Sequence, residues 1–200
     1  CSALESIAIP DGVTDIGNYV FENCTSLKNV TLSDNLSSFG EEVFSGCDSL
    51  ITEASGNCLY LGSTNNPYLC LFKAKSTDIS NVSISDRCRI IYEKAFKDCA
   101  SLTSITLPDS ISDIGDYIFS GCSSLKSVNI PAGVTSIEGT FSGCSSIESI
   151  NIPESVTSIG NSAFSGCASL KSITLPSRLS AFGYHVFHGC SALESIVLPD

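Results

Sequence analysis

Cysteine is the residue type of this chain with the widest chemical repertoire, because a thiol can form a disulfide, bind a metal or act as a nucleophile. Eleven cysteines occur in 200 residues, and eight of them recur at a nearly constant interval: Cys1, Cys24, Cys47, Cys99, Cys122, Cys144, Cys167 and Cys190. No two are spaced as C-x-x-C, the usual arrangement of a zinc site. The even spacing instead predicts one small, buried thiol in each of a series of repeated units, stacked into a ladder.

The two histidines, His185 and His188, form an H-x-x-H pair close to Cys190. Their positions hold Ser, Tyr or Glu in several other units, so we interpret both as surface residues and not as metal ligands. The sequence contains no G-x-S-x-G nucleophile elbow and no glycine-rich phosphate loop after a strand. It therefore predicts no catalytic residue, no metal and no cofactor, and the chain is expected not to be an enzyme.

The charge balance argues against two classes of partner. The net charge is −11, from 10 Lys and Arg against 21 Asp and Glu, and the longest basic cluster is Arg87-Cys88-Arg89. Nucleic acids and anionic membrane surfaces both attract basic patches, which this chain lacks. No apolar run approaches the roughly 20 residues that span a bilayer. Neither nucleic acid nor direct membrane insertion is expected.

Phenylalanine and proline follow the same interval as the cysteines, so the chain consists of internal repeats. In the unit that starts at Cys122, the segment after Leu125 alternates apolar and polar residues with the two-residue period of a strand, with Val128 and Ile130 apolar, and Pro131 ends it. A second apolar pair and a turn follow, with Val134, Ile137 and Phe141. Such a unit cannot bury its own apolar face. The repeats therefore predict a solenoid, mainly β, with parallel strands about 4.8 Å apart.

The motif L-x-x-I-x-L-P-x-x-[LVI]-x-x-I-G-x-x-x-F-x-x-C resembles the BspA-like leucine-rich repeats of bacterial and protozoan surface proteins. Residues 102–122 fit it almost residue for residue, and residues 170–190 fit equally except that Phe182 replaces the Ile. The match spans nearly the whole chain. The resemblance implies a leucine-rich-repeat right-handed superhelix, with parallel strands on the concave face. Short second strands and turns or short helical segments are then expected on the convex side.

One interval is too long, because Cys47 and Cys99 are 52 residues apart. Counting back one unit from Cys99 leaves residues 48–76 as an insertion, after which Ile79, Val82 and Ile84 resume the first strand of a unit. Apolar residues 58–61 and 68–72 flank the turn formers at 62–67, which predicts a β-hairpin. We expect one domain over residues 1–200, as a fragment of a longer chain, with this hairpin inside it.

Two cysteines of the insertion have two possible fates. If the hairpin pairs Cys58 opposite Cys70, the thiols come within disulfide range. A register shifted by one residue puts them on opposite faces and leaves both reduced.

Two surfaces are candidates for binding. A polar strip of small, uncharged side chains is predicted to face outward from the first strands of four consecutive units, at Ser104, Thr106, Ser127, Asn129, Ser149, Asn151, Ser172 and Thr174. The concave sheet of a solenoid commonly binds partners, although short polar side chains also suit any solvated sheet. A row of mixed charges beside the strip can either pair between units or steer a partner; it comprises Glu5, Lys28, Lys126, Glu148, Lys171 and Glu194.

The second candidate surface is the hairpin, through Tyr60, Asn65, Asn66 and Tyr68. Tyrosines are common at interface hot spots. The same tyrosines would equally serve to pack the hairpin onto the solenoid, and the insertion would then act as a spacer between two blocks of repeats.

The family resemblance implies surface display and adhesion. We therefore expect a non-catalytic binding module, extracellular and either cell-surface or secreted, whose partners are proteins or glycoproteins of the extracellular matrix or of other cells. One alternative is a structural stalk or filament element that self-associates. Another is an accessory repeat region of a larger enzyme.

Overall fold

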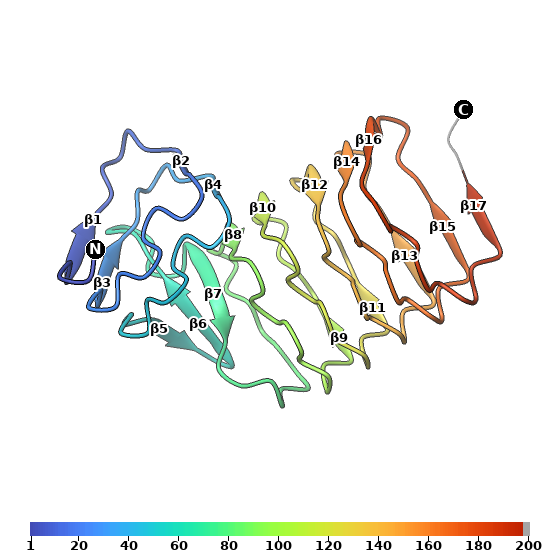
Figure 1. Ribbon diagram of the computed structural model, residues 1–200, viewed down its shortest axis with the longest axis horizontal. Coiled ribbons are helices and arrows are strands. Elements are labelled where there is room, and N and C mark those ends of the chain that lie inside the picture. Colours follow the sequence, from blue (N-terminus) through green and yellow to red (C-terminus); the bar gives the residue numbers. More distant parts are fainter. Residues whose placement is uncertain (198–200) are drawn as a thin grey trace.

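The repeated units fold into coils whose apolar segments form short strands, and these strands lie in two rows along the solenoid (Figure 1). The structure, a computed structural model, describes residues 1–197. The first row contains β1 (Ser6–Ala8), β3 (Asn29–Thr31), β9 (Ser104–Ile105), β11 (Ser127–Val128), β13 (Ser149–Asn151), β15 (Ser172–Thr174) and β17 (Ser195–Val197). The second row contains β2 (Asp15–Ile16), β4 (Ser38–Phe39), β8 (Ile90–Ile91), β10 (Asp113–Ile114), β12 (Ser136–Ile137), β14 (Ser158–Ile159) and β16 (Ala181–Phe182).

Turns connect the rows, and residues 1–197 include no helix. The described part of the chain accordingly holds no helix able to cross a membrane.

The repeat length sets the register of the strands. Ser6 lies beside Asn29, Ser104 beside Ser127 and Ser149 beside Ser172, all in parallel pairs. A strand residue therefore meets its equivalent in the next unit. This register confirms the predicted solenoid of parallel strands.

Two ladders of side chains fill the core between the rows. The rings of Phe96, Phe119, Phe141 and Phe164 are buried and stacked, with centroids 5.7, 5.9 and 5.5 Å apart. Six of the eight periodic cysteines are buried, whereas Cys1 is exposed and Cys190 half-buried. The Cys144 thiol donates a hydrogen bond to the carbonyl oxygen of Phe119 at 3.1 Å. The thiol ladder predicted from spacing is confirmed except in the first and last coils.

The turn before each ladder cysteine requires a left-handed backbone. Residue Gly121 has a φ of 78°, and the equivalent Asn23 and Asp98 have φ values of 56° and 59°. Glycine, asparagine and aspartate adopt this conformation at least cost. This need explains the G-C dipeptide that recurs at the end of the units.

The insertion forms a hairpin, as predicted, but it has a third strand. Strands β5 (Glu53–Ser55), β6 (Cys58–Leu61) and β7 (Cys70–Ala74) are antiparallel neighbours. Strand β7 then pairs in parallel with β8, and β8 with β10. The hairpin is therefore continuous with the second row of the solenoid.

The hairpin divides the interior into two cores, one on each face of its sheet. Cys58, Tyr60 and Leu71 belong to the core of the later coils. Leu61 and Cys70 belong to the core of the earlier coils. The insertion is thus a partition with two apolar faces, because alternate residues of a strand point to opposite sides.

The pairing within the hairpin also decides between the two fates of its cysteines. Cys58 lies opposite Ala74, and Cys70 lies opposite Leu61. The two thiols face different cores, and both cysteines are free. No disulfide joins them.

One predicted strand is absent. Residues 79–85 carry the apolar side chains of a first strand, and Ile79 and Ile84 are buried. The backbone there forms no strand, and the carbonyl oxygen of Asn81 accepts a hydrogen bond from the Asn57 side chain at 2.9 Å. The neighbouring hairpin stands in place of the preceding regular coil, so a strand at this position would have a regular partner only on the side of β9.

Candidate binding surfaces

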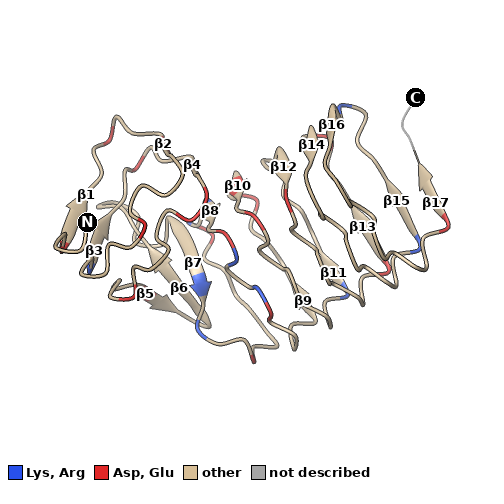
Figure 2. Cartoon of the chain, in the orientation of Figure 1, with Lys and Arg blue, Asp and Glu red and all other residues tan. Residues whose placement is uncertain are grey.

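The polar strip lies on the first row of strands, on the side away from the core. All eight of its residues are exposed, and they alternate with buried residues such as Ile105, Ile150 and Ile173. Charged residues are absent from the first-row strands β9, β11, β13 and β15 and occur only beside them (Figure 2). The strip is therefore a neutral surface of hydroxyl and amide groups.

The strip has one discontinuity, between β11 and β13, which belong to different sheets. A hollow of ≈ 430 Å³ lies there, lined by Ser104, Thr106, Ser127, Asn129 and Asn151 among others. The Asn129 side chain bonds to the backbone of Leu107, accepting from its N–H and donating to its carbonyl, both at 2.9 Å. This amide therefore completes the end of the β9–β11 ladder and is not free to bind a partner.

The charged row beside the strip pairs between coils. Lys171 bonds to Glu148 at 2.7 Å, and Lys28 lies 3.6 Å from Glu5. The hydrogen bond from Lys171 holds the pKa of the Glu148 carboxyl below its usual value. For these four residues pairing is the observed role.

The hairpin does not present Tyr60 as an exposed contact residue. Tyr60 is completely buried, so it is not available to a partner. Its hydroxyl accepts a hydrogen bond from the Ser85 N–H at 3.2 Å, and its ring packs against the edge of Tyr68 at 5.3 Å. Burial raises the pKa of Tyr60 well above its usual range. Tyr60 therefore packs the hairpin onto the solenoid, the second of the two roles considered for it.

The turn of the hairpin is also tied to the coils. The Asn66 amide donates to the carbonyl oxygen of Arg87 at 2.7 Å, and its side-chain oxygen accepts from the Tyr68 N–H at 3.1 Å. Asn65 is exposed, but its amide bonds to the Asp34 carboxylate. Of the four hairpin residues, Asn65 alone is exposed, and Asn66 and Tyr68 are half-buried.

His185 and His188 are both exposed on the last turn, with ring centroids 5.7 Å apart. The nearby Cys190 thiol donates to the carbonyl oxygen of Phe164 at 3.0 Å. The thiol thus continues the ladder instead of joining the histidines.

Sequence reasoning missed one feature, which is a break in the second row between β4 and β8. In intact coils, three amides of each turn donate to carbonyls of the following coil, and two of these bonds run from Lys94 N–H to Asp116 at 2.8 Å and from Phe96 N–H to Ile118 at 2.9 Å. The amides equivalent to these two before the break belong to Glu42 and Phe44. The Glu93 carboxylate accepts from the Glu42 N–H at 2.8 Å.

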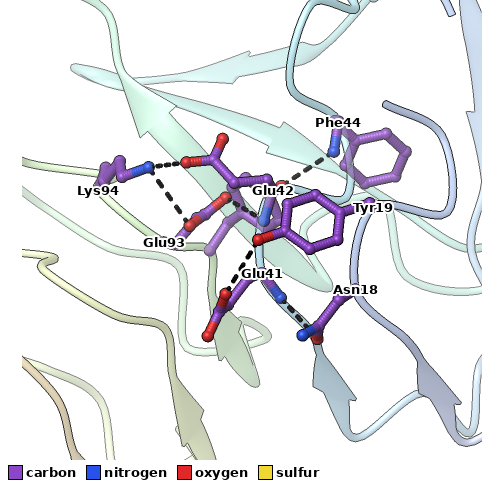
Figure 3. Close-up of polar contacts among 8 residues, drawn as sticks. Asn18, Tyr19, Glu41, Glu42, Phe44, Glu93 and Lys94 are labelled. Carbon is purple, nitrogen blue, oxygen red and sulfur yellow. Dashed lines mark hydrogen bonds and ion pairs between the residues drawn. The ribbon is translucent and has the colours of Figure 1, made fainter. Parts of the chain in front are cut away.

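The Phe44 amide at the break is satisfied by a hydroxyl. The Phe44 N–H donates to the Tyr92 hydroxyl at 3.0 Å, and Lys94 forms ion pairs with Glu42 and Glu93 (Figure 3). Side chains thus replace two of the missing backbone acceptors. The signal in the sequence was Tyr92, which stands where the repeat motif has glycine; Gly115 shows the usual state, packed against the backbone of Glu93.

A family model matches most of the chain. The model of the BspA type leucine rich repeat region matches residues 1–63 and 71–194, in 6 copies. Of the unmatched residues, 64–70 lie at the tip of the hairpin. No curated protein matches the chain.

Several solved structures are similar. A leucine rich cell surface protein from Faecalibacterium prausnitzii is 30% identical with a TM-score of 0.71, over 100% of this chain and 61% of that chain. The T. pallidum Leucine Rich Repeat protein is 27% identical with a TM-score of 0.54, over 95% of this chain and 78% of that one. The pneumococcal vaccine antigen PcpA, 18% identical with a TM-score of 0.61 over 98% of this chain and 56% of its own, supports the fold alone. The chain spans less than two thirds of the Faecalibacterium protein.

Proposed function

Because the chain belongs to the BspA-type leucine-rich-repeat family, we propose that it is a non-catalytic binding module of an extracellular protein, cell-surface or secreted. Its partners are proteins or glycoproteins of the extracellular matrix or of other cells. The name of the Faecalibacterium relative, a cell surface protein, supports the location.

The observation that carries the proposal is the exposed polar strip on the first row of strands. Its hydroxyl and amide groups are held at fixed spacing by the parallel ladders, so a partner meets a rigid array. Binding to a rigid array costs less conformational entropy than binding to mobile side chains. Small neutral polar groups can hydrogen bond to peptide and sugar groups alike.

A charge-introduction experiment tests the strip. Four strip residues whose side chains make no hydrogen bond in the structure are replaced by lysine: Ser127, Ser149, Asn151 and Ser172. Asn129 is left intact because its amide completes the backbone of Leu107. The control carries four lysines at exposed positions that immediately precede second-row strands: Ser112, Thr135, Thr157 and Ser180.

Binding is measured by surface plasmon resonance on immobilised matrix glycoproteins and on a glycan array. We expect the strip variant to lose at least tenfold in affinity while the control variant stays within twofold. Equal affinity of both variants, with circular dichroism spectra like that of the parent, would contradict binding through the strip.

A further inference from the structure

The break in the second row leaves a notch in the surface of the molecule. Strand β4 pairs only with β2, and β7 occupies the place beside β8 that β4 would have in a regular solenoid. Two adjoining hollows of ≈ 170 Å³ and ≈ 540 Å³ lie at this point. Both are lined by Glu41, Glu93, Asp116 and Ser136, so they form one continuous notch.

The edge of β4 at the break is a row of unpaired hydrogen-bond acceptors. In the next coil, the carbonyls of Arg89 and Ile91 accept from Ser112 N–H at 2.9 Å and Gly115 N–H at 2.7 Å. The equivalent carbonyls before the break are those of Ser37 and Phe39. No donor among residues 1–197 bonds to them.

The donors that the repeat would supply are bound elsewhere. Arg89 N–H donates to Leu69 and Tyr92 N–H to Leu71, each at 2.9 Å, so the hairpin has taken both amides. The exposed edge of a sheet is a known template for the addition of an extended segment.

The lining of the notch is strongly acidic. Its lining includes one ammonium group, that of Lys94, which is already paired with Glu42 and Glu93. It also includes six carboxylates, those of Glu41, Glu42, Glu93, Asp113, Asp116 and Glu138. Burial, together with the nearby carboxylates, raises the pKa of Asp116 to about 6, and burial does the same for Asp113. The ribbon is red at β10 and at turns near it, where acidic residues lie (Figure 2). A cation in the notch would relieve this repulsion.

Two aromatic rings flank the carboxylates. Tyr19 and Tyr117 line the larger hollow, and the Tyr19 hydroxyl donates to the Glu41 carboxylate at 3.3 Å (Figure 3). Tyrosine rings bind ammonium and guanidinium groups through their faces. Carboxylates, free carbonyls and aromatic faces together select a ligand that is cationic and rich in N–H donors.

We propose that the notch is an interaction surface for an extended, basic segment of a protein partner. Lysine or arginine side chains of that segment lie against the carboxylates, and its backbone N–H groups bond to the carbonyls of Ser37 and Phe39. This surface is separate from the polar strip, and it does not depend on which ligand the strip binds.

The probe is a ten-residue peptide in which arginine alternates with serine, beside a peptide in which glutamate replaces arginine. Binding to the whole chain is measured by fluorescence anisotropy at low and at physiological salt. We expect the basic peptide to bind and the acidic peptide not to bind. Raising the salt concentration should weaken the complex, because exposed charges are screened.

The site is assigned with two isosteric variants. Asp113→Asn with Asp116→Asn removes two carboxylates that accept no hydrogen bond from another side chain, and should weaken binding of the basic peptide at least tenfold. The matched control, Asp78→Asn with Asp109→Asn, removes the same charge at other positions and should change affinity less than twofold. Circular dichroism and thermal melting establish that both variants are folded.

A third arm separates backbone pairing from charge alone. The basic peptide with N-methyl groups on alternate residues keeps its charge but loses donors, and should bind at least fivefold more weakly. No binding of the basic peptide, or equal loss in both double variants, overturns the proposal. Equal affinity of the N-methylated peptide overturns the role of Ser37 and Phe39. Saturable calcium binding that depends on Asp113 and Asp116, without peptide binding, would replace the partner by a metal ion and overturn it also.

Discussion

Replacing Tyr92 by Phe removes a single oxygen atom from the break in the second row. That oxygen accepts the hydrogen bond of the Phe44 N–H at 3.0 Å. The substitution keeps the ring, which packs at 5.4 Å from Phe39 and 5.2 Å from Phe72. The change therefore tests the hydrogen bond with little disturbance of packing.

The magnitude follows from burial. Tyr92 is 6% exposed and Phe44 4% exposed, so water reaches the freed amide poorly. A buried donor left without a partner costs about 1–3 kcal/mol. For a chain of this size the melting temperature should fall by roughly 2–12 °C. Tyr184→Phe, at an 80% exposed position, is the control and should change stability by less than about 0.5 kcal/mol.

Urea denaturation followed by circular dichroism measures the global cost, and hydrogen exchange measured by mass spectrometry reports the local one. Peptides covering residues 40–47 should exchange faster in Tyr92→Phe, whereas peptides from the β13–β15–β17 sheet should not. A loss below about 0.5 kcal/mol with unchanged exchange at residues 40–47 would refute the idea that Tyr92 replaces a backbone acceptor.

Three further predictions concern the cores and the notch. Truncation of Phe119 or Phe164 to Ala should cost about 3–5 kcal/mol in urea denaturation, because both rings are completely buried in the ladder, and a cost below about 1 kcal/mol would contradict the stacked core. Thiol labelling of the native protein should reach Cys1 first and miss most of the cysteines of the ladder. Those thiols are buried, and burial raises the pKa of Cys99 to about 11 and of Cys122 to about 12. Rapid labelling of six or more cysteines without denaturant would contradict this prediction. The pKa of Asp113 and of Asp116 is raised to about 6 in the folded state, so their contribution to stability is present below about pH 4 and is lost as pH rises through 6. In chemical denaturation, the free energy of unfolding of the Asp113→Asn, Asp116→Asn variant should therefore rise relative to that of the parent as pH increases from 4 to 7. A difference between variant and parent that stays constant over this range would contradict the prediction.

The fold was predictable from the sequence because the same residue types mark successive coils. Cysteine, phenylalanine and proline, as at Cys122, Phe119 and Pro131, recur at the interval that also sets the register of the strands. The spacing of these residues along the chain is therefore the spacing of the ladder. The hairpin was predictable from its turn formers between two apolar runs. Both inferences depend on local pattern alone.

Other features depend on how the coils meet across the insertion, and local pattern does not encode that. The apolar residues of β6 and β7 predicted a hairpin but not the two cores that it separates, which Tyr60 and Leu61 enter on opposite sides. The free edge of β4 arises because β7 captures the amides of Arg89 and Tyr92. Asn129 looked like an available strip residue, whereas its amide bonds to Leu107.

Locating a bound partner on the solenoid is the most direct test of whether the binding module works through its first row of strands. A photo-reactive amino acid is placed at Ser149 on the strip or at Thr157 on the second row, and the chain is irradiated while bound to a matrix glycoprotein. The proposed function predicts cross-links from position 149 and few from position 157. Cross-links from position 157 alone, or equal yields from both, would contradict binding through the polar strip.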